Sequence, residues 1–309
     1  MIVITAGERY LDIDAYASGI AYAKLLSCLG EDAIFASSAQ PNSSVCELVK
    51  SLGFDYEKNY QPKPNDKFII LDLSAPEYFD KIVSLKNVIE VIDHHTGFEN
   101  YWKTQPIKTQ IEFIGSVATI IFERYKEANK LDLIDEKLAK LLISAILDNT
   151  LNLKSSITTE RDKEAYETLQ KIGGFDKNFD KAYFESCEKD IKENIVYTIK
   201  NDIKEQKVSK LLPEIIGQVT IFNKEVVIEK LTEIQATMSV FEKSWMLNII
   251  CIKDGKSYIV CDDKVTRQKI SKLFNKKFKD NVLILDNFLL RKQIIKFASE
   301  QKNQKTPSV

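Results

Sequence analysis

A six-residue run in the first half of the chain, Phe68-Ile69-Ile70-Leu71-Asp72-Leu73, is apolar at every position except one. Apolar residues on both alternating faces are typical of a strand in a parallel sheet that helices cover on both sides. An ionised carboxylate within such a run is costly to bury unless a cation compensates its charge. Asp72 therefore predicts a metal ion at the end of a buried strand.

Short β-branched runs and amphipathic helical stretches alternate along the first half of the chain. Such alternation predicts parallel strands that are joined by helices. The expected strands are residues 2–5, 33–36, 68–73 and 88–92, and the expected helices are residues 14–29, 45–52, 115–128, 135–149 and 159–171, with another helix opening at Pro76. The fold class is therefore α/β, with an N-terminal doubly wound, mainly parallel sheet.

The second half predicts a smaller α/β or α+β domain. Gly173-Gly174 is the only pair of adjacent glycines, and the polar segment from there to Pro213 is typical of a helical connection. Strands are expected at 215–222, 246–253, 257–261 and 282–285, and helices at 226–241 and 265–274. We expect a domain at 1–180 that carries the metal site, and a connector helix with a substrate-binding domain at 181–309. The lysine-rich segment 296–309 is expected to be a solvated terminus.

Composition limits the class of protein and its partners. Hydrophobic residues at 44% and charged residues at 29% are ordinary for a globular chain and exclude a disordered one. The net charge of −1 gives no general attraction to nucleic acid or to an anionic membrane. No run reaches the length of a membrane span, and the first residues do not resemble a signal peptide, so we expect a cytoplasmic protein. The five cysteines form no CxxC pair and are expected to be reduced thiols.

Acidic residues follow several of the expected strands. Asp12 and Asp14 come after the first strand, and Asp93-His94-His95 comes directly after residues 88–92. Ligands collect at the carboxyl ends of parallel strands, so these side chains are expected to converge with Asp72. Single aspartates there are often only helix caps, but the whole set favours a metal site. Carboxylates with imidazole suit Mn²⁺, with Mg²⁺ or Co²⁺ as alternatives, and so many like charges call for two ions.

These motifs resemble the DHH phosphoesterase superfamily, and more closely its branch of family II inorganic pyrophosphatases, prune and exopolyphosphatases. Residues 7–15 resemble the first motif, Asp72 the second, and Val91-Ile92-Asp93-His94-His95 the motif that names the superfamily. Residues 112–119 resemble the helix start that follows, and residues 144–155 with 158–162 resemble the fourth motif. The resemblance covers most of residues 1–165.

The resemblance implies roles for individual residues. One Mn²⁺ would be held by Asp12, Asp72 and Glu8, and the second by Asp14, Asp72, His94 and Asp148. His95 would be catalytic and stabilise charge on the transferred group, while Asp93 would orient the histidines. In the second half, Lys192, Arg291 and Lys292 would bind the phosphate groups of the substrate.

The expected activity is hydrolysis of pyrophosphate or short polyphosphate by a metal-activated water. One alternative is a nucleotide or oligonucleotide phosphodiesterase of the same superfamily, although the GGGH motif of those branches is missing. Another is a non-catalytic binding protein. Two departures from the family motivate it: Glu8 replaces a histidine or asparagine, and Leu289-Leu290-Arg291-Lys292-Gln293 replaces S-R-K-K-Q. Dimers occur in this branch, so a homodimer is a further expectation.

Overall fold

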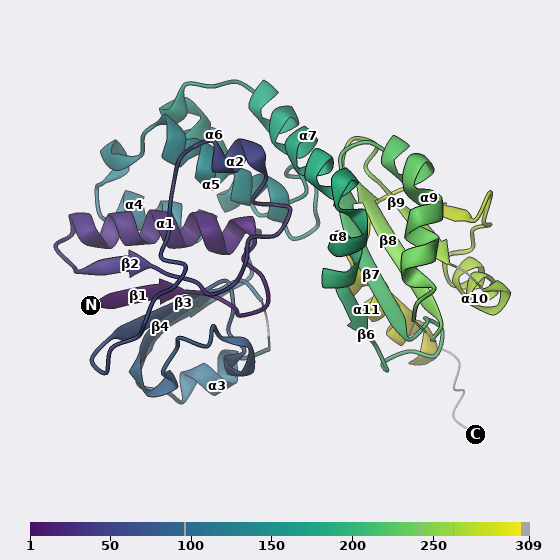
Figure 1. The fold of residues 1–309 in the computed structure, drawn as a ribbon, viewed down its shortest axis with the longest axis horizontal. Coiled ribbons are helices and arrows are strands. Elements are labelled where there is room, and N and C mark those ends of the chain that lie inside the picture. The colour runs from purple at the N-terminus through teal and green to yellow at the C-terminus, as the bar shows by residue number, and fades with distance from the viewer. Residues whose placement is uncertain (96, 242, 262, 304–309) are drawn as a thin grey trace. The chain divides into compact units, whose positions relative to one another are not determined.

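The chain folds as two compact units, Met1–Ser186 and Cys187–Val309 (Figure 1). The computed structural model describes residues 1–95, 97–241, 243–261 and 263–303. Residues 304–309, the end of the segment expected to be a solvated terminus, lie outside the described residues. No helix among the described residues is long and apolar enough to cross a membrane. The metal-binding and substrate-binding roles expected of the two parts of the chain stay predictions.

The first unit contains a five-stranded sheet in which every pair of neighbours is parallel. The strand order is β2-β1-β3-β4-β5, with bounds β1 Ile2–Thr5, β2 Ala33–Phe35, β3 Lys67–Leu71, β4 Val88–Asp93 and β5 Lys108–Ile111. The chain leaves β1 for β2 on one side and returns to β3 on the other, so the strand order reverses at β1. Such a switch point opens a crevice at the carboxyl ends of the strands, which is where ligands bind in this class of sheet.

Helices cover the two faces of this sheet, with α1 on one side and α3 on the other in Figure 1. The helices that begin in the first unit are α1 Ile13–Cys28, α2 Glu47–Lys50, α3 Glu99–Lys103, α4 Val117–Glu127, α5 Glu136–Asn149, α6 Glu160–Gly173 and α7 Asn178–Glu193. Short 3-10 turns lie at Pro76–Tyr78, Leu85–Asn87 and Leu131–Leu133. The predicted α/β class and the mainly parallel first sheet are confirmed.

The prediction of a helix that opens at Pro76 is wrong, because only a single 3-10 turn forms there. The 3-10 turn ends at Tyr78, and the backbone is extended at Phe79. Phe79 and Ile82 are both buried against the apolar sides of the sheet strands. The backbone N–H of Asp80 donates to the Ala6 carbonyl at 2.9 Å, so it is not available for a hydrogen bond within a continued helix.

The second unit holds a smaller, mixed sheet. Its order is β10-β9-β8-β7-β6, with bounds β6 Ile203–Glu205, β7 Ile215–Ile221, β8 Trp245–Cys251, β9 Lys256–Cys261 and β10 Val282–Leu285. Only β7 and β8 pair in parallel, and the other neighbours are antiparallel. Its further helices are α8 Ile195–Asn201, α9 Glu225–Met238, α10 Lys264–Phe274 and α11 Arg291–Asn303. Two separate apolar clusters, one on each face, hold helices against this sheet.

The expectation of a solvated terminus from residue 296 is wrong for the part that the structure describes. Residues 291–303 form α11, in which Ile294 and Ala298 are fully buried. These two residues are four positions apart and lie on one face of the helix. The many lysines of the exposed face conceal that narrow apolar stripe in the sequence. All five cysteines are free thiols, as predicted.

Candidate metal centre

Asp72 lies directly after β3, beside the switch point of the first sheet. Its φ is 60°, a left-handed conformation that aspartate tolerates better than most residues. Its backbone N–H donates to the Ile92 carbonyl of β4 at 2.9 Å, which fixes the turn against the neighbouring strand. This backbone conformation ends the strand and turns the carboxylate toward the residues that follow β4.

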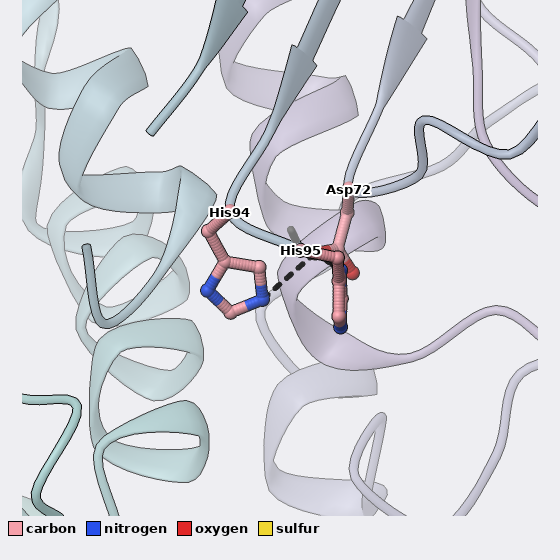
Figure 2. Close-up of side chains that lie close together, drawn as sticks. All are labelled: Asp72, His94 and His95. Atoms are coloured by element: carbon pink, nitrogen blue, oxygen red, sulfur yellow. Dashed lines mark ion pairs between the residues drawn. The ribbon is translucent and has the colours of Figure 1, made fainter. Parts of the chain in front are cut away.

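Asp72, His94 and His95 form a group whose possible ligand atoms all lie within 4.8 Å of one another (Figure 2). Asp72 Oδ1 lies 3.2 Å from His94 Nε2 and 3.8 Å from His95 Nδ1. Within the described residues, Asp72 forms ion pairs with these two histidines only. The group therefore combines carboxylate oxygen with imidazole nitrogen, the mixed ligand set that suits Mn²⁺.

The hydrogen bonds of His94 determine which of its ring nitrogens can bind a metal. Nδ1 lies 3.1 Å from the Ile114 carbonyl, which can only accept, so Nδ1 carries a hydrogen and donates it. In the neutral ring, Nε2 then presents a lone pair to Asp72 Oδ1. That oxygen is buried and accepts no well-aligned hydrogen bond from the described residues, even though Nε2 is near. Two lone pairs at this distance repel each other unless a proton or a cation lies between them.

A divalent ion fits the distance between these two atoms. Ligands that each lie about 2.1 Å from one ion, at right angles, are roughly 3 Å apart. The observed 3.2 Å between Asp72 Oδ1 and His94 Nε2 agrees with this. Both side chains are at most 6% exposed, so water cannot replace the ion as the compensating partner. The donors present therefore fit a bound divalent metal.

Asp93 holds His95 in place. Asp93 is fully buried, and its Oδ1 accepts from the backbone N–H of His95 at 3.0 Å and from Nδ1 at 2.9 Å. Burial lowers the pKa of His95, but the hydrogen bond to Asp93 and the charge of Asp72 outweigh it, so the pKa is raised overall. Because Nδ1 faces Asp93 and the side chain is 55% exposed, a protonated His95 can present Nε2–H outward.

Asp12 and Asp14 both make helix-capping hydrogen bonds. Asp12 caps α1, with Oδ1 accepting from Ala15 N at 3.0 Å. Asp14 is fully buried and accepts from the amides of Val117 and Ala118 at 2.8 and 2.9 Å, at the start of α4. Burial raises the pKa of Asp14. Capping thus occupies part of both carboxylates. The cap by Asp12 of the helix that follows it agrees with the simpler sequence interpretation, whereas Asp14 caps a helix more than 100 positions later.

Electrostatics nevertheless link these carboxylates to Asp72. Burial raises the pKa of Asp72 well above its usual value, and the nearby charges of Asp12 and Asp14 raise it further. Burial likewise raises the pKa of Asp148 to about 7, and Asp12 and Asp14 again contribute. The carboxylates of four residues from distant parts of the chain therefore repel one another at the carboxyl ends of the sheet strands. These residues are Asp12, Asp14, Asp72 and Asp148.

Glu8 is not among the side chains grouped around Asp72. It lies on an exposed loop whose backbone is held by the N–H of Glu8 donating to the Tyr78 carbonyl at 3.0 Å. Its role as a metal ligand stays a prediction.

The basic residues of the second unit differ in their partners. Lys192 Nζ lies 2.5 Å from Glu229 Oε2. Arg291 is 9% exposed, and its guanidinium donates to the carbonyl of Asp202 and to Asp202 Oδ1, at 2.7 and 2.6 Å. Lys292 forms no ion pair with the described residues, and partial burial lowers its pKa. Of the three predicted phosphate contacts, Lys292 has the least competition from protein carboxylates.

Sequence reasoning did not single out Tyr183, whose hydroxyl lies 3.0 Å from Asp148 Oδ1. Tyr183 is fully buried in α7. Nothing in its local sequence distinguishes it from a core tyrosine, because its partner is 35 positions away. Only a three-dimensional structure could identify this contact.

Known proteins resemble the chain at the level of both sequence and fold. Residues 1–146 match the model of the DHH family, N-terminal domain. A protein of Lactobacillus acidophilus assigned as a manganese-dependent inorganic pyrophosphatase is 32% identical over 173 residues, which are 55% of this chain and 54% of that protein. The match thus spans about half the length of that relative. The manganese-dependent inorganic pyrophosphatase of Bacillus subtilis is 29% identical over 311 residues, with 94% of this chain and 95% of that protein covered.

Two solved structures share the fold. A Methanococcus jannaschii protein assigned to the family II inorganic pyrophosphatases has a TM-score of 0.68 and 23% identity, and the match covers 98% of this chain and 100% of that one. An exopolyphosphatase-related protein from Bacteroides fragilis has a TM-score of 0.53 and 15% identity, covering 98% and 93% of the two chains. These two likenesses, both below 25% identity, show the fold. The match to the DHH family model covers residues 1–146, just under half of the chain.

Proposed function

We propose that the protein is a metal-dependent hydrolase that cleaves pyrophosphate or short polyphosphate. The observation that carries the proposal is the buried contact between Asp72 Oδ1 and His94 Nε2, 3.2 Å apart, because a divalent cation between them would bind both lone pairs. The sequence similarity to manganese-dependent pyrophosphatases over most of the chain supports this substrate class.

The proposed cofactor is a pair of Mn²⁺ ions, with Mg²⁺ or Co²⁺ as alternatives. Asp12, Asp72 and Glu8 would hold one ion, and Asp14, Asp72, His94 and Asp148 the other, with Asp72 shared. Such a pair supplies a water that ionises near neutral pH and neutralises charge on the phosphate oxygens. The mutual repulsion of Asp12, Asp14, Asp72 and Asp148 supports the assignment of these four carboxylates, because divalent cations relieve it.

The residues of the protein itself have three tasks in this proposal. His95 holds a proton at Nε2 and donates it to a phosphate oxygen as negative charge develops there. Asp93 keeps the ring in that orientation through Nδ1. Lys292 contacts the phosphate groups, whereas Lys192 and Arg291 must first exchange Glu229 and Asp202 for the substrate.

The most direct experiment measures phosphate release from pyrophosphate, tripolyphosphate, long polyphosphate and dinucleotides, with and without Mn²⁺. We expect release from pyrophosphate or tripolyphosphate only with the metal. Release from dinucleotides alone would favour the phosphodiesterase alternative, and no release from any substrate would favour a binding protein. Asp72→Ala and His94→Ala should each lower turnover at least ~100-fold.

A control variant is available on β4, the strand that leads into the DHH residues. Glu90 is 5% exposed on β4, but its carboxylate is already neutralised by Lys108 at 2.8 Å and Arg124 at 3.4 Å. Glu90→Gln should therefore retain turnover, whereas equal losses in this variant and in Asp72→Ala would show a general effect of unfolding.

The proposal extends to a cytoplasmic homodimer without nucleic-acid or membrane partners, and size-exclusion chromatography tests the dimer.

A further inference from the structure

We propose that Ser44 and Tyr183 form a brace that fixes the spacing between two elements of the metal centre, the start of α1 and the end of α5. The inference rests on the proposed function, because it assigns the brace its role through Asp12, Asp14 and Asp148 as metal ligands. Neither Ser44 nor Tyr183 would itself bind metal or substrate. They are positioning residues.

The side chain of Ser44 forms a hydrogen bond with the start of α1. Its Oγ accepts from the backbone N–H of Ile13 at 2.9 Å, in a buried contact. Ile13 is the residue between Asp12 and Asp14, so this contact fixes the peptide that joins the two carboxylates. The Ser44 hydroxyl in turn donates to Asn42 Oδ1 at 2.6 Å, and Asn42 N donates to the Leu11 carbonyl at 2.9 Å. The loop before α2 thus holds residues 11 to 13 at two points.

Tyr183 connects this loop to Asp148. Its hydroxyl oxygen lies 3.1 Å from the Ser44 carbonyl and 3.0 Å from Asp148 Oδ1. A phenol has one hydrogen, whereas a carbonyl and a carboxylate can only accept, so the hydroxyl lies at a fork between two acceptors. An ionised carboxylate is the stronger acceptor. Because Tyr183 is fully buried, packing fixes the position of its hydroxyl.

The end of α5 has a particular need for such a support. Thr150 caps this helix, and the next residues, Leu151, Asn152 and Leu153, have φ values of 50°, 59° and 60°. Three consecutive non-glycine residues in the left-handed region are unfavourable, because the Cβ of an L-residue there lies close to the following carbonyl oxygen. Such a backbone persists only where the surroundings determine it strongly. The hydrogen bond from Tyr183 is one contact that holds Asp148 at the point where this strained turn begins.

The brace joins residues that are far apart in the sequence, 44, 148 and 183, by hydrogen bonds within one unit. Loss of a group that orients a metal ligand typically weakens metal affinity about 10–100-fold. We therefore expect Tyr183→Phe to weaken Mn²⁺ binding in this range at one of the two proposed ions, although the substitution removes a single oxygen atom.

The experiment titrates the metal-depleted full-length chain with Mn²⁺ and follows free and bound ion by electron paramagnetic resonance. The matched control is Tyr125→Phe. Tyr125 is also fully buried, and its hydroxyl donates to the Ala21 carbonyl at 2.7 Å, without contact to a predicted ligand. The brace predicts about 10–100-fold weaker binding in Tyr183→Phe, wild-type binding in Tyr125→Phe, and recovery of turnover in Tyr183→Phe at high Mn²⁺.

The outcomes separate the brace from the proposed function. A wild-type chain that binds no Mn²⁺ refutes the proposed function and the brace with it. Wild-type binding with unchanged affinity in Tyr183→Phe, or an equal loss in Tyr125→Phe, overturns the brace alone. If Tyr183→Phe does not fold, Ser44→Ala tests the brace in its place. This variant removes the acceptor for Ile13 N and must also weaken Mn²⁺ binding.

Discussion

The ligand properties of His94 depend on one backbone carbonyl. Because the Ile114 carbonyl accepts a hydrogen bond from Nδ1–H, Nε2 is the ring atom that can bind a metal. It lies 3.2 Å from Asp72 Oδ1. A glutamine at position 94 could keep one of these two contacts, but its amide cannot present an aromatic nitrogen lone pair. The chemistry of the site therefore depends on residues that touch the ligands as well as on the ligands themselves.

The pKa of Asp148 leads to a prediction about pH and stability. Burial raises this pKa from 3.8 to about 7, so the metal-free folded chain binds a proton there more tightly than the unfolded chain does. Its contribution must therefore lower the free energy of unfolding as the pH rises from about 4 to about 7. Asp148→Asn removes this titration. In chelator, wild type should lose stability relative to Asp148→Asn between pH 5 and 8, as measured by urea unfolding.

Addition of Mn²⁺ should reverse that trend. A cation favours the ionised carboxylate, and metal binding competes with protons, so the stabilisation by Mn²⁺ should increase over the same pH range. Thermal unfolding of the wild type at pH 5.5 and pH 8 measures this directly. Equal stabilisation at both pH values would contradict a buried acidic site.

At the scale of elements, Gly115 fits α4 against the rest of the site. A Cβ there would lie 2.6 Å from Thr150 Cγ2 and 2.7 Å from Asp162 Oδ2. The neighbouring Ile114 carbonyl holds His94, and Asp14 accepts from Val117 N. Gly115→Ala should therefore cost about 1–3 kcal/mol of stability and also weaken Mn²⁺ binding, because the segment that orients His94 must shift.

Gly174→Ala is the control for this variant. Gly174 ends α6 with a φ of 66°, and no atom lies within 4 Å of the Cβ that an alanine would add. The expected cost is about 1 kcal/mol, from backbone conformation alone, with unchanged Mn²⁺ affinity. Isothermal titration of both variants decides the matter, since equal affinities in the two would exclude the proposed role of the segment around Gly115.

Periodicity identified the elements whose burial follows a regular pattern. The apolar run around Asp72 and the amphipathic stretches of α1, α5 and α6 correspond to observed elements within a few residues. By contrast, β5 was missed because its residues Lys108–Ile111 are mostly polar and lie at the edge of the sheet. The helix α3 has only 5 residues, too few to show a helical period.

Some residues of the candidate site could likewise be identified from the sequence, and others could not. Asp72 could be found because a charge interrupts an apolar run, and Asp93, His94 and His95 because they follow a strand. Ser44 and Tyr183 could not be found, because their contact joins positions 139 residues apart and depends on packing. Capping by Asp14 of a helix about 100 residues later was likewise hidden from the sequence.

For the whole molecule, Mn²⁺ should be a structural as well as a catalytic component. A ligand that binds only the folded state adds about 2.7 kcal/mol at one hundred times its dissociation constant. Differential scanning calorimetry with excess Mn²⁺ should therefore show a higher unfolding temperature than calorimetry in chelator. The same shift should be absent from Asp72→Ala, and its persistence there would locate the stabilising ion elsewhere.

Convergence of distant acidic residues and one imidazole on bound divalent ions is the central claim. Anomalous diffraction at the manganese absorption edge, from crystals grown with Mn²⁺, tests it most directly. We expect anomalous peaks in contact with Asp72 and His94, with Asp12, Asp14 and Asp148 among the surrounding ligands. Peaks that avoid Asp72 and His94, or no peak in the first unit, would contradict the claim.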